Sequence, residues 1–162
     1  MDEVKRELVR AWLIKARNDS TAARQIAASP DGPLDAAIYH CQQSSEKAVK
    51  GFLAFHDHRL ERSHDVERLV ELAAVYEARF KDYEDAAIIL TPYATAYRYP
   101  ENQPHSNRAE RNLVRRLASL AIFSRLCVRF YPQKFYRPSD SDDLSRFAAR
   151  RENLRDIKTR RD

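Results

Sequence analysis

Apolar residues recur through most of the chain at intervals of three and four positions, which is the period of one face of an α-helix. The first such stretch extends from Val4 to Ala28 without a glycine or a proline. Its predicted inward face consists of Leu8, Trp12, Ala16, Asp19, Ala23 and Ile26. The next segment, SPDGP at 29–33, holds a pre-proline residue and an Asp-Gly turn, so we expect the chain to reverse there.

A second helix is predicted from about Leu34 to His56. Its apolar seam has the spacing of a helix bundle and consists of Leu34, Ile38, Cys41, Ser45, Ala48, Phe52 and Phe55. The central residues of this seam are small. Small seam residues let a neighbouring helix approach closely, and this neighbour belongs either to the same chain or to a second copy.

The helical period continues in three later segments. Ser63 is the predicted N-cap of a third helix, whose inward face is Val66, Leu69, Ala73, Tyr76 and Phe80. A fourth segment carries Ala86, Ile89, Tyr93 and Tyr97, with a kink expected at Pro92. A long helix over about 106–130 then presents Leu113, Leu117, Leu120, Ser124, Cys127 and Tyr131.

The pattern therefore predicts an all-α protein, with an up-and-down bundle of four or five helices over residues 1–136. Residues 137–162 carry alternating charges around a narrow apolar stripe. They predict a charged C-terminal extension, formed as an appended helix or arm that is either docked on a partner or frayed.

Composition agrees with a helical protein and indicates a compartment. Two glycines in 162 residues argue against a glycine-punctuated sheet protein. Both cysteines fall on apolar stripes and neither belongs to a CxxC spacing, which favours a reducing compartment. The N-terminus lacks the apolar run of a signal peptide, and no stretch reaches the roughly 18 apolar residues of a membrane span. We therefore expect a cytoplasmic protein that does not cross a membrane.

Candidate chemistry is concentrated in the second predicted helix. Its segment CQQSSEKAVKGFL places four polar side chains within about two turns, namely Gln43, Glu46, Lys47 and Lys50. Glu46 and Lys50 could simply form an i,i+4 pair on a solvated face, worth about 0.2–0.5 kcal/mol. Asp19 raises the interest, because a carboxylate on an apolar face needs a charged or hydrogen-bonded partner, which Lys47 or Arg98 could supply.

Four segments together resemble the HEPN domain family, in that family's order and spacing. They are WLIKARNDSTAA at 12–23, HCQQSSEKAVKGFL at 40–53, SHDVERLVELA at 63–73 and YRYP at 97–100. The resemblance implies a four- or five-helix bundle that usually pairs as a homodimer. It also implies a gene often found beside a minimal nucleotidyltransferase, with the two proteins acting as toxin and antitoxin.

Many HEPN domains are metal-independent ribonucleases with an Arg-x(4–6)-His motif, and in this chain Arg98 and His105 match it. A ribose 2′-hydroxyl that attacks its own phosphate needs a proton acceptor and a cation near the phosphorus, and these two residues could provide both. However, Pro100 disfavours a helical conformation at Tyr99, so the pair is expected on opposite sides of a loop. The alternative is that Arg98 caps the fourth helix and His105 is an exposed loop residue.

The Arg-Tyr-Pro form resembles HEPN branches for which nucleotide binding has been proposed. Arg108, Arg111 and Arg115 share one face of the long predicted helix. Beside Tyr99 they could hold phosphates while the ring stacks on a base, or they could form a solvated outer face.

Histidines suggest a polar contact more than a metal site. His56 and His58 point to different helix faces, and no second cluster completes a tetrahedral set, so no metal and no cofactor are expected. His64 is expected to begin the third helix and to contact the region of Glu46 and Lys47. The predicted structural polar network consists of Asp19, Gln43, Glu46 and His64.

The sequence thus supports two hypotheses. In the first, the protein binds nucleotide or RNA phosphate in a toxin–antitoxin type module with a nucleotidyltransferase partner, through Lys47, Lys50, Arg98, Tyr99, Arg108, Arg111 and Arg115. In the second, it is a ribonuclease toxin that uses Arg98 and His105. Both assume one polar pocket, in which the second helix presents Gln43, Glu46 and Lys47 toward Asp19 and Arg98.

Overall fold

The computed structural model describes residues 3–96 and Asn112, and this part of the chain is helical without a strand. Its elements are α1 (Glu3–Ala28), α2 (Leu34–Phe55), α3 (Val66–Ala74), the 3-10 helix η1 (Ala78–Tyr83), α4 (Glu84–Leu90) and α5 (Tyr93–Ala96). The all-α prediction is confirmed. No helix in the described part is apolar over a length that could cross a bilayer. The long predicted helix over 106–130 and the extension over 137–162 lie outside the described residues.

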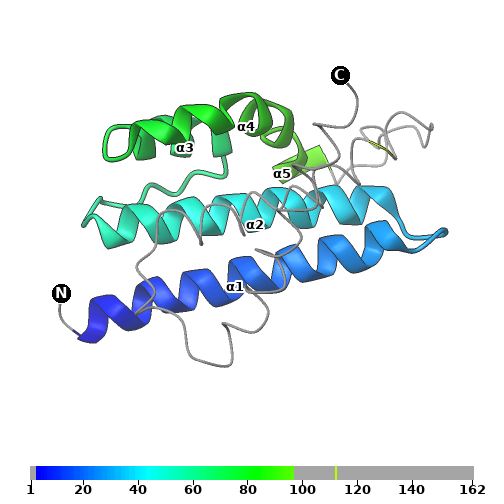
Figure 1. Ribbon diagram of the computed structural model, residues 1–162, viewed down its shortest axis with the longest axis horizontal. Coiled ribbons are helices and arrows are strands. Elements are labelled where there is room, and N and C mark those ends of the chain that lie inside the picture. Colours follow the sequence, from blue (N-terminus) through cyan, green and yellow to red (C-terminus); the bar gives the residue numbers. More distant parts are fainter. Residues whose placement is uncertain (1–2, 97–111, 113–162) are drawn as a thin grey trace, which may run out of the picture. The chain divides into compact units, whose positions relative to one another are not determined.

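α1 and α2 form an antiparallel hairpin around the predicted turn (Figure 1). α1 ends where the Ser29 N–H donates to the Ile26 carbonyl over 3.1 Å. Gly32 packs so closely on this carbonyl that a Cβ atom at Gly32 would lie 2.0 Å from its oxygen. The turn therefore requires a glycine at this position, and the predicted reversal at 29–33 is confirmed.

α2 is the central helix of the described part, with α1 on one side and α3, α4 and α5 on the other (Figure 1). Its middle is buried on most sides, and Ala48, Val49 and Leu53 have no exposed surface. The ring of Phe52 packs on that of Phe80 in η1, with the centroids 4.6 Å apart. Because α2 is covered on both sides, a polar side chain that it buries needs a partner inside the bundle.

Cys41 belongs to the buried surface of α2. Burial raises the pKa of its thiol to about 12, so the thiol stays protonated at neutral pH. It therefore packs as a small apolar residue, as its place on the seam predicts.

The buried face of α1 is rotated by about one residue from the predicted face. It consists of Val9, Leu13, Ala16, Ser20, Ala23 and Ala27, whereas Leu8 is 50% exposed. The Ser44 hydroxyl of α2 donates to the Ala16 carbonyl over 2.8 Å, which requires a close approach of the two backbones. Only small residues fit at the centre of such a contact, so the larger Trp12 and Asp19 lie at its edge.

α2 ends in a Schellman motif, which starts the connection to α3. The His58 N–H donates to the Leu53 carbonyl over 2.9 Å, and the Asp57 N–H donates to the Ala54 carbonyl over 3.2 Å. Asp57 has the left-handed conformation that this motif needs, with φ 58°. Its carboxylate also receives the Lys5 ammonium of α1 at 2.5 Å, so the end of α2 is tied to the start of α1.

Asp65 caps α3, so the prediction of Ser63 as the N-cap was wrong. Asp65 Oδ1 accepts the Arg68 N–H over 3.0 Å. Ser63 Oγ instead accepts the N–H of Asp65 over 3.1 Å, one step earlier in the same turn. Both side chains can cap a helix, and sequence spacing did not distinguish them.

η1 interrupts the helical period that the sequence predicts between α3 and α4. Phe80 is fully buried, but Tyr76 is 42% exposed. The tighter 3-10 winding also changes the phase of α4, which buries Ala87 and Leu90 and leaves the predicted Ile89 39% exposed. The predicted inward faces of these two segments were therefore partly wrong.

Candidate functional site

Two polar clusters lie along α2, and each is built around one carboxylate that bridges a histidine and a lysine. The Asp19 cluster consists of Asp19, His40 and Lys47. The Glu46 cluster consists of Gln42, Glu46, Lys50 and His64. Their composition is similar, but their burial and their partners differ.

The Asp19 cluster joins α1 to α2 through side chains alone. Asp19 Oδ1 lies 2.9 Å from His40 Nδ1, and Asp19 Oδ2 accepts the Lys47 ammonium at 2.5 Å. The three side chains are partly exposed, at 14% for Asp19, 31% for His40 and 22% for Lys47. Water and small polar ligands can therefore reach this cluster.

The Glu46 cluster joins α2 to the connection that precedes α3. Glu46 Oε1 accepts the Lys50 ammonium at 2.8 Å, and Glu46 Oε2 accepts the Gln42 amide at 3.1 Å. His64 Nδ1 lies 3.2 Å from both carboxylate oxygens. The side chains of Glu46 and Lys50 are only 6% and 8% exposed, so this ion pair is buried.

The same cluster also satisfies backbone carbonyls of the connection. Lys50 donates to the Ser63 carbonyl over 2.6 Å, and Gln42 donates to the His64 carbonyl over 3.1 Å. Carbonyl groups that are partly withdrawn from water need such partners, and here α2 side chains supply them. The Glu46 cluster therefore fixes the path of the chain between α2 and α3.

The single polar pocket that the sequence suggested is not formed by the described residues. Glu46 and Lys47 are consecutive in α2 and so point about 100° apart, Glu46 toward His64 and Lys47 toward Asp19. Gln43 donates to Gln42 Oε1 over 2.8 Å instead of to Asp19. Arg98, the remaining member of the predicted pocket, lies outside the described residues.

The structure separates the two predicted phosphate-binding lysines. Lys50 is buried and donates to the Glu46 carboxylate and to the Ser63 carbonyl, which favours a structural role. Lys47 stays partly exposed beside Asp19. The other predicted phosphate ligands and the predicted catalytic pair lie outside the described residues, namely Arg98, Tyr99, His105, Arg108, Arg111 and Arg115.

His40 is a site residue that the sequence reasoning did not single out. A usable signal was present, because His40 and Lys47 are seven residues apart and so lie on the same face of a helix. The turn at 29–33 brings that face against α1, where Asp19 is the nearby carboxylate. The predicted pairing of Asp19 with Lys47 did not include His40.

The remaining described histidines have separate surroundings. The ring of His56 stacks on that of Tyr76. The pKa of His56 is lowered, mainly by partial burial and to a smaller extent by the nearby Lys5 ammonium. His58 Nδ1 lies 3.0 Å from the Tyr76 hydroxyl. Within residues 3–96, no three histidine, cysteine or acidic side chains group in a way that could hold a metal ion.

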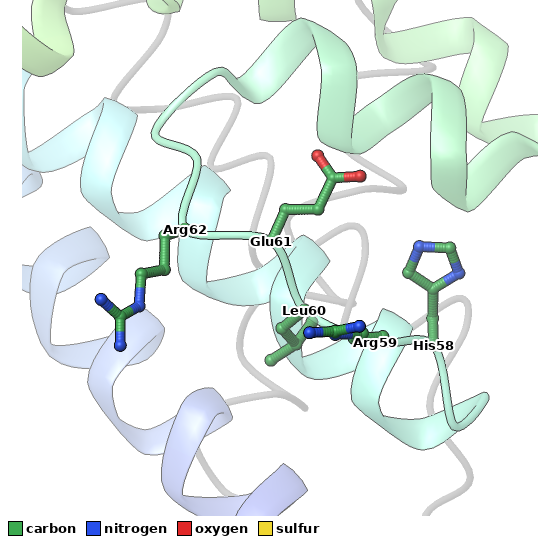
Figure 2. Close-up of a pocket in the computed structure, with 5 residues that line it drawn as sticks. All are labelled: His58, Arg59, Leu60, Glu61 and Arg62. Carbon is green, nitrogen blue, oxygen red and sulfur yellow. The ribbon is translucent and has the colours of Figure 1, made fainter.

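A hollow also lies in the connection after α2, lined by His58, Arg59, Leu60, Glu61 and Arg62. Figure 2 shows these side chains spread along the connection instead of pointing to a common centre. The hollow contains neither cluster. It is therefore a weaker candidate for a ligand site than the Asp19 cluster.

Comparison with known proteins gives one match. A family model described as the HEPN domain matches residues 9–124, which is more than half of the chain. The match includes both clusters. No curated protein and no solved structure matches the chain.

Proposed function

Because this chain belongs to the HEPN domain family, we propose that it binds RNA or nucleotide phosphate at the face of the bundle that carries the Asp19 cluster. The partly exposed state of this cluster is the observation that carries the proposal. Lys47 supplies a cation there, and His40 supplies a second hydrogen-bonding group with access to solvent. The buried Lys50, which belongs to the Glu46 cluster, is not part of the proposed phosphate site.

The proposal includes Arg98 and Tyr99, which follow α5 in the sequence. α5 contacts α2, and in Figure 1 it lies beside the N-terminal half of α2, where His40 is located. The Arg98 guanidinium would hold a phosphate and the Tyr99 ring would stack on a base. The stripe of Arg108, Arg111 and Arg115 would extend the same basic surface.

Binding can be tested by fluorescence anisotropy with a labelled single-stranded RNA in EDTA, between about 50 and 200 mM salt. We expect Arg98→Ala to weaken binding and to reduce the slope of log K against log salt by about 1, because one phosphate contact is lost. Lys81→Ala, at an exposed lysine of η1, is the control and should leave binding unchanged. Absence of RNA binding, or equal effects of the two substitutions, would contradict the proposal.

A second function is favoured by the motif itself. Arg98 and His105 have the Arg-x(6)-His spacing of ribonuclease members of the family, and the same phosphate face would then carry out metal-independent RNA cleavage. Incubation of total RNA in EDTA with the protein and with His105→Ala tests this reading. Cleavage that is lost in the variant supports a ribonuclease toxin, whereas binding without cleavage supports a regulatory role.

We also propose a homodimer and a minimal nucleotidyltransferase as partner, within a toxin–antitoxin type module. Light scattering should then give twice the 18.9 kDa mass of the chain. Co-expression of a nucleotidyltransferase encoded beside the gene should yield a complex that survives gel filtration. A monomer that copurifies with no such protein would count against both partners.

A further inference from the structure

We propose that His40 is a proton-transfer residue for RNA phosphodiester cleavage and that Asp19 positions it. This inference rests on the ribonuclease reading of the proposed function. It gives His40 the proton-acceptor role that the motif alone would assign to His105, a residue outside the described part of the chain. Its basis is the geometry of the Asp19 cluster.

The contact between His40 and Asp19 selects one tautomer of the neutral imidazole. His40 Nδ1 lies 2.9 Å from Asp19 Oδ1, and a carboxylate oxygen is an acceptor, so Nδ1 carries the proton. The other ring nitrogen, Nε2, is then the basic one. Nε2 has no hydrogen bond to any residue of the described part. The imidazole is 31% exposed, so a ribose hydroxyl can reach it.

Lys47 completes the arrangement from the same face of α2. Its ammonium lies 2.5 Å from Asp19 Oδ2, so both oxygens of the carboxylate are held and the carboxylate cannot rotate away from His40. The Tyr39 ring contacts the His40 ring edge-on, with the centroids 5.6 Å apart. Among the described side chains, the titratable groups around His40 are Asp19 and Tyr39, which contact it, and Lys47, which contacts Asp19. A lysine beside the site also places a positive charge near an incoming phosphate.

The other described histidines are less suited to this role. His56 is stacked on Tyr76 and His58 contacts the hydroxyl of the same tyrosine, both at the far end of α2. His64 also faces a carboxylate, but it shares Glu46 with two other donors, and its own carbonyl is held by Gln42. The His64 side chain is the more exposed of the two, at 66% against 31% for His40. His40 differs in its shorter contact, 2.9 Å, to a carboxylate oxygen that no other described side chain shares.

The proposed step balances without an external oxidant or a metal. Neutral His40 Nε2 takes the proton of the ribose 2′-hydroxyl as the 2′-oxygen forms a bond to phosphorus. The bond from phosphorus to the 5′-oxygen breaks, and this oxygen takes a proton from water. The products are a 2′,3′-cyclic phosphate and a 5′-hydroxyl, and His40 then returns its proton to the hydroxide that water left behind.

The test measures kcat/KM against pH in EDTA for cleavage of a labelled single-stranded RNA, with mass spectrometry of the product ends. We expect His40→Ala and His40→Gln to lower kcat/KM by about 100-fold or more, as the loss of a general base does. Both should also lose the acidic limb of the pH profile, which reports protonation of His40. Asp19→Asn should give a smaller loss with a displaced acidic limb. His58→Ala is the matched histidine control and should behave as the native protein.

Far-UV circular dichroism separates a folding defect from a catalytic one, and His40→Gln keeps a polar group in the cluster if His40→Ala unfolds. If the native protein cleaves RNA and the folded His40 variants cleave equally well, the inference is overturned while the ribonuclease function stands. If the native protein binds RNA without cleavage, the inference and the ribonuclease reading both fail while phosphate binding stands. Without cleavage or binding, the proposed function fails as well.

Discussion

The two clusters on α2 are built from the same three kinds of side chain, yet they have different physical roles. In the Glu46 cluster the carboxylate and the lysine are almost fully buried, and the surrounding donors hold backbone carbonyls of the α2–α3 connection. In the Asp19 cluster every contact is between side chains, and all three remain partly exposed. A histidine, a carboxylate and a lysine in contact therefore do not indicate a function until their burial is known.

Burial also determines what removal of one member costs. A buried ion pair that loses one partner leaves an uncompensated charge in the interior, whereas water can solvate what remains of a partly exposed pair. The Glu46 cluster should therefore affect mainly stability. Removal of a member of the Asp19 cluster should affect mainly the binding of the proposed ligand.

The largest expected effect is that of Lys50→Met. This change leaves Glu46 buried without its ammonium partner and leaves the Ser63 carbonyl without its donor, so we expect a loss of about 3–5 kcal/mol in the free energy of unfolding. Urea denaturation at neutral pH measures it, with Lys81→Met at an exposed lysine as the control. A loss of unfolding free energy close to that of the control would show that buried Glu46 does not need the Lys50 ammonium as its partner.

Lys47→Met should have a smaller effect on stability. It removes a charged hydrogen bond to Asp19, which we expect to cost about 1.5–3 kcal/mol, because Asp19 keeps His40 and some contact with water. The same denaturation experiment ranks the two lysines. If Lys47→Met proved the more destabilising, the contrast drawn from burial would be wrong.

Asp65→Ala tests how much of the α2–α3 connection is held by its helix cap instead of by the Glu46 cluster. Loss of the cap on the Arg68 N–H should cost about 1 kcal/mol. Ser63→Ala removes the neighbouring hydroxyl and serves as the comparison. Equal or larger losses for Ser63→Ala would restore Ser63 as the more important residue of the turn.

Stability should depend weakly on pH through His56, which lies outside both clusters. Partial burial lowers its pKa below the usual 6.5, so the unfolded chain binds this proton more readily than the folded protein. The contribution of His56 is therefore complete above about pH 6.5 and is lost as the pH falls toward the lower folded pKa. Thermal melts between pH 7 and 5 should show a smaller decrease for His56→Gln than for the native protein. An identical decrease would assign the pH dependence to other groups.

Much of the fold could be predicted, because α1 and α2 are long helices with uninterrupted periods and a strong turn between them. The bounds of both helices match the prediction to within one residue. After α2 the prediction was less accurate. Periodicity assumes one winding throughout, and η1 breaks that assumption between α3 and α4. The choice between Ser63 and Asp65 as the cap depends on backbone angles, which the residue pattern does not reveal.

The contacts of the candidate site were also predicted only in part. Pairing of Asp19 with Lys47 followed from a charge on an apolar face. Contact between His64 and Glu46 followed from the expectation that His64 begins the third helix, although α3 begins at Val66. The error was to merge these contacts into one pocket, although consecutive residues of a helix cannot face the same way. The role of Arg98 and His105 stays a prediction.

The most direct test measures stability and RNA affinity together for Lys47→Met and Lys50→Met. The difference between the clusters predicts opposite rankings in the two measurements. Lys50→Met should lose more free energy of unfolding than Lys47→Met, whereas Lys47→Met should lose more RNA affinity than Lys50→Met. Affinity should be measured under conditions in which both variants are folded. If Lys50→Met lost as much RNA affinity as Lys47→Met, the assignment of a structural role to the buried cluster and a functional role to the exposed one would be contradicted.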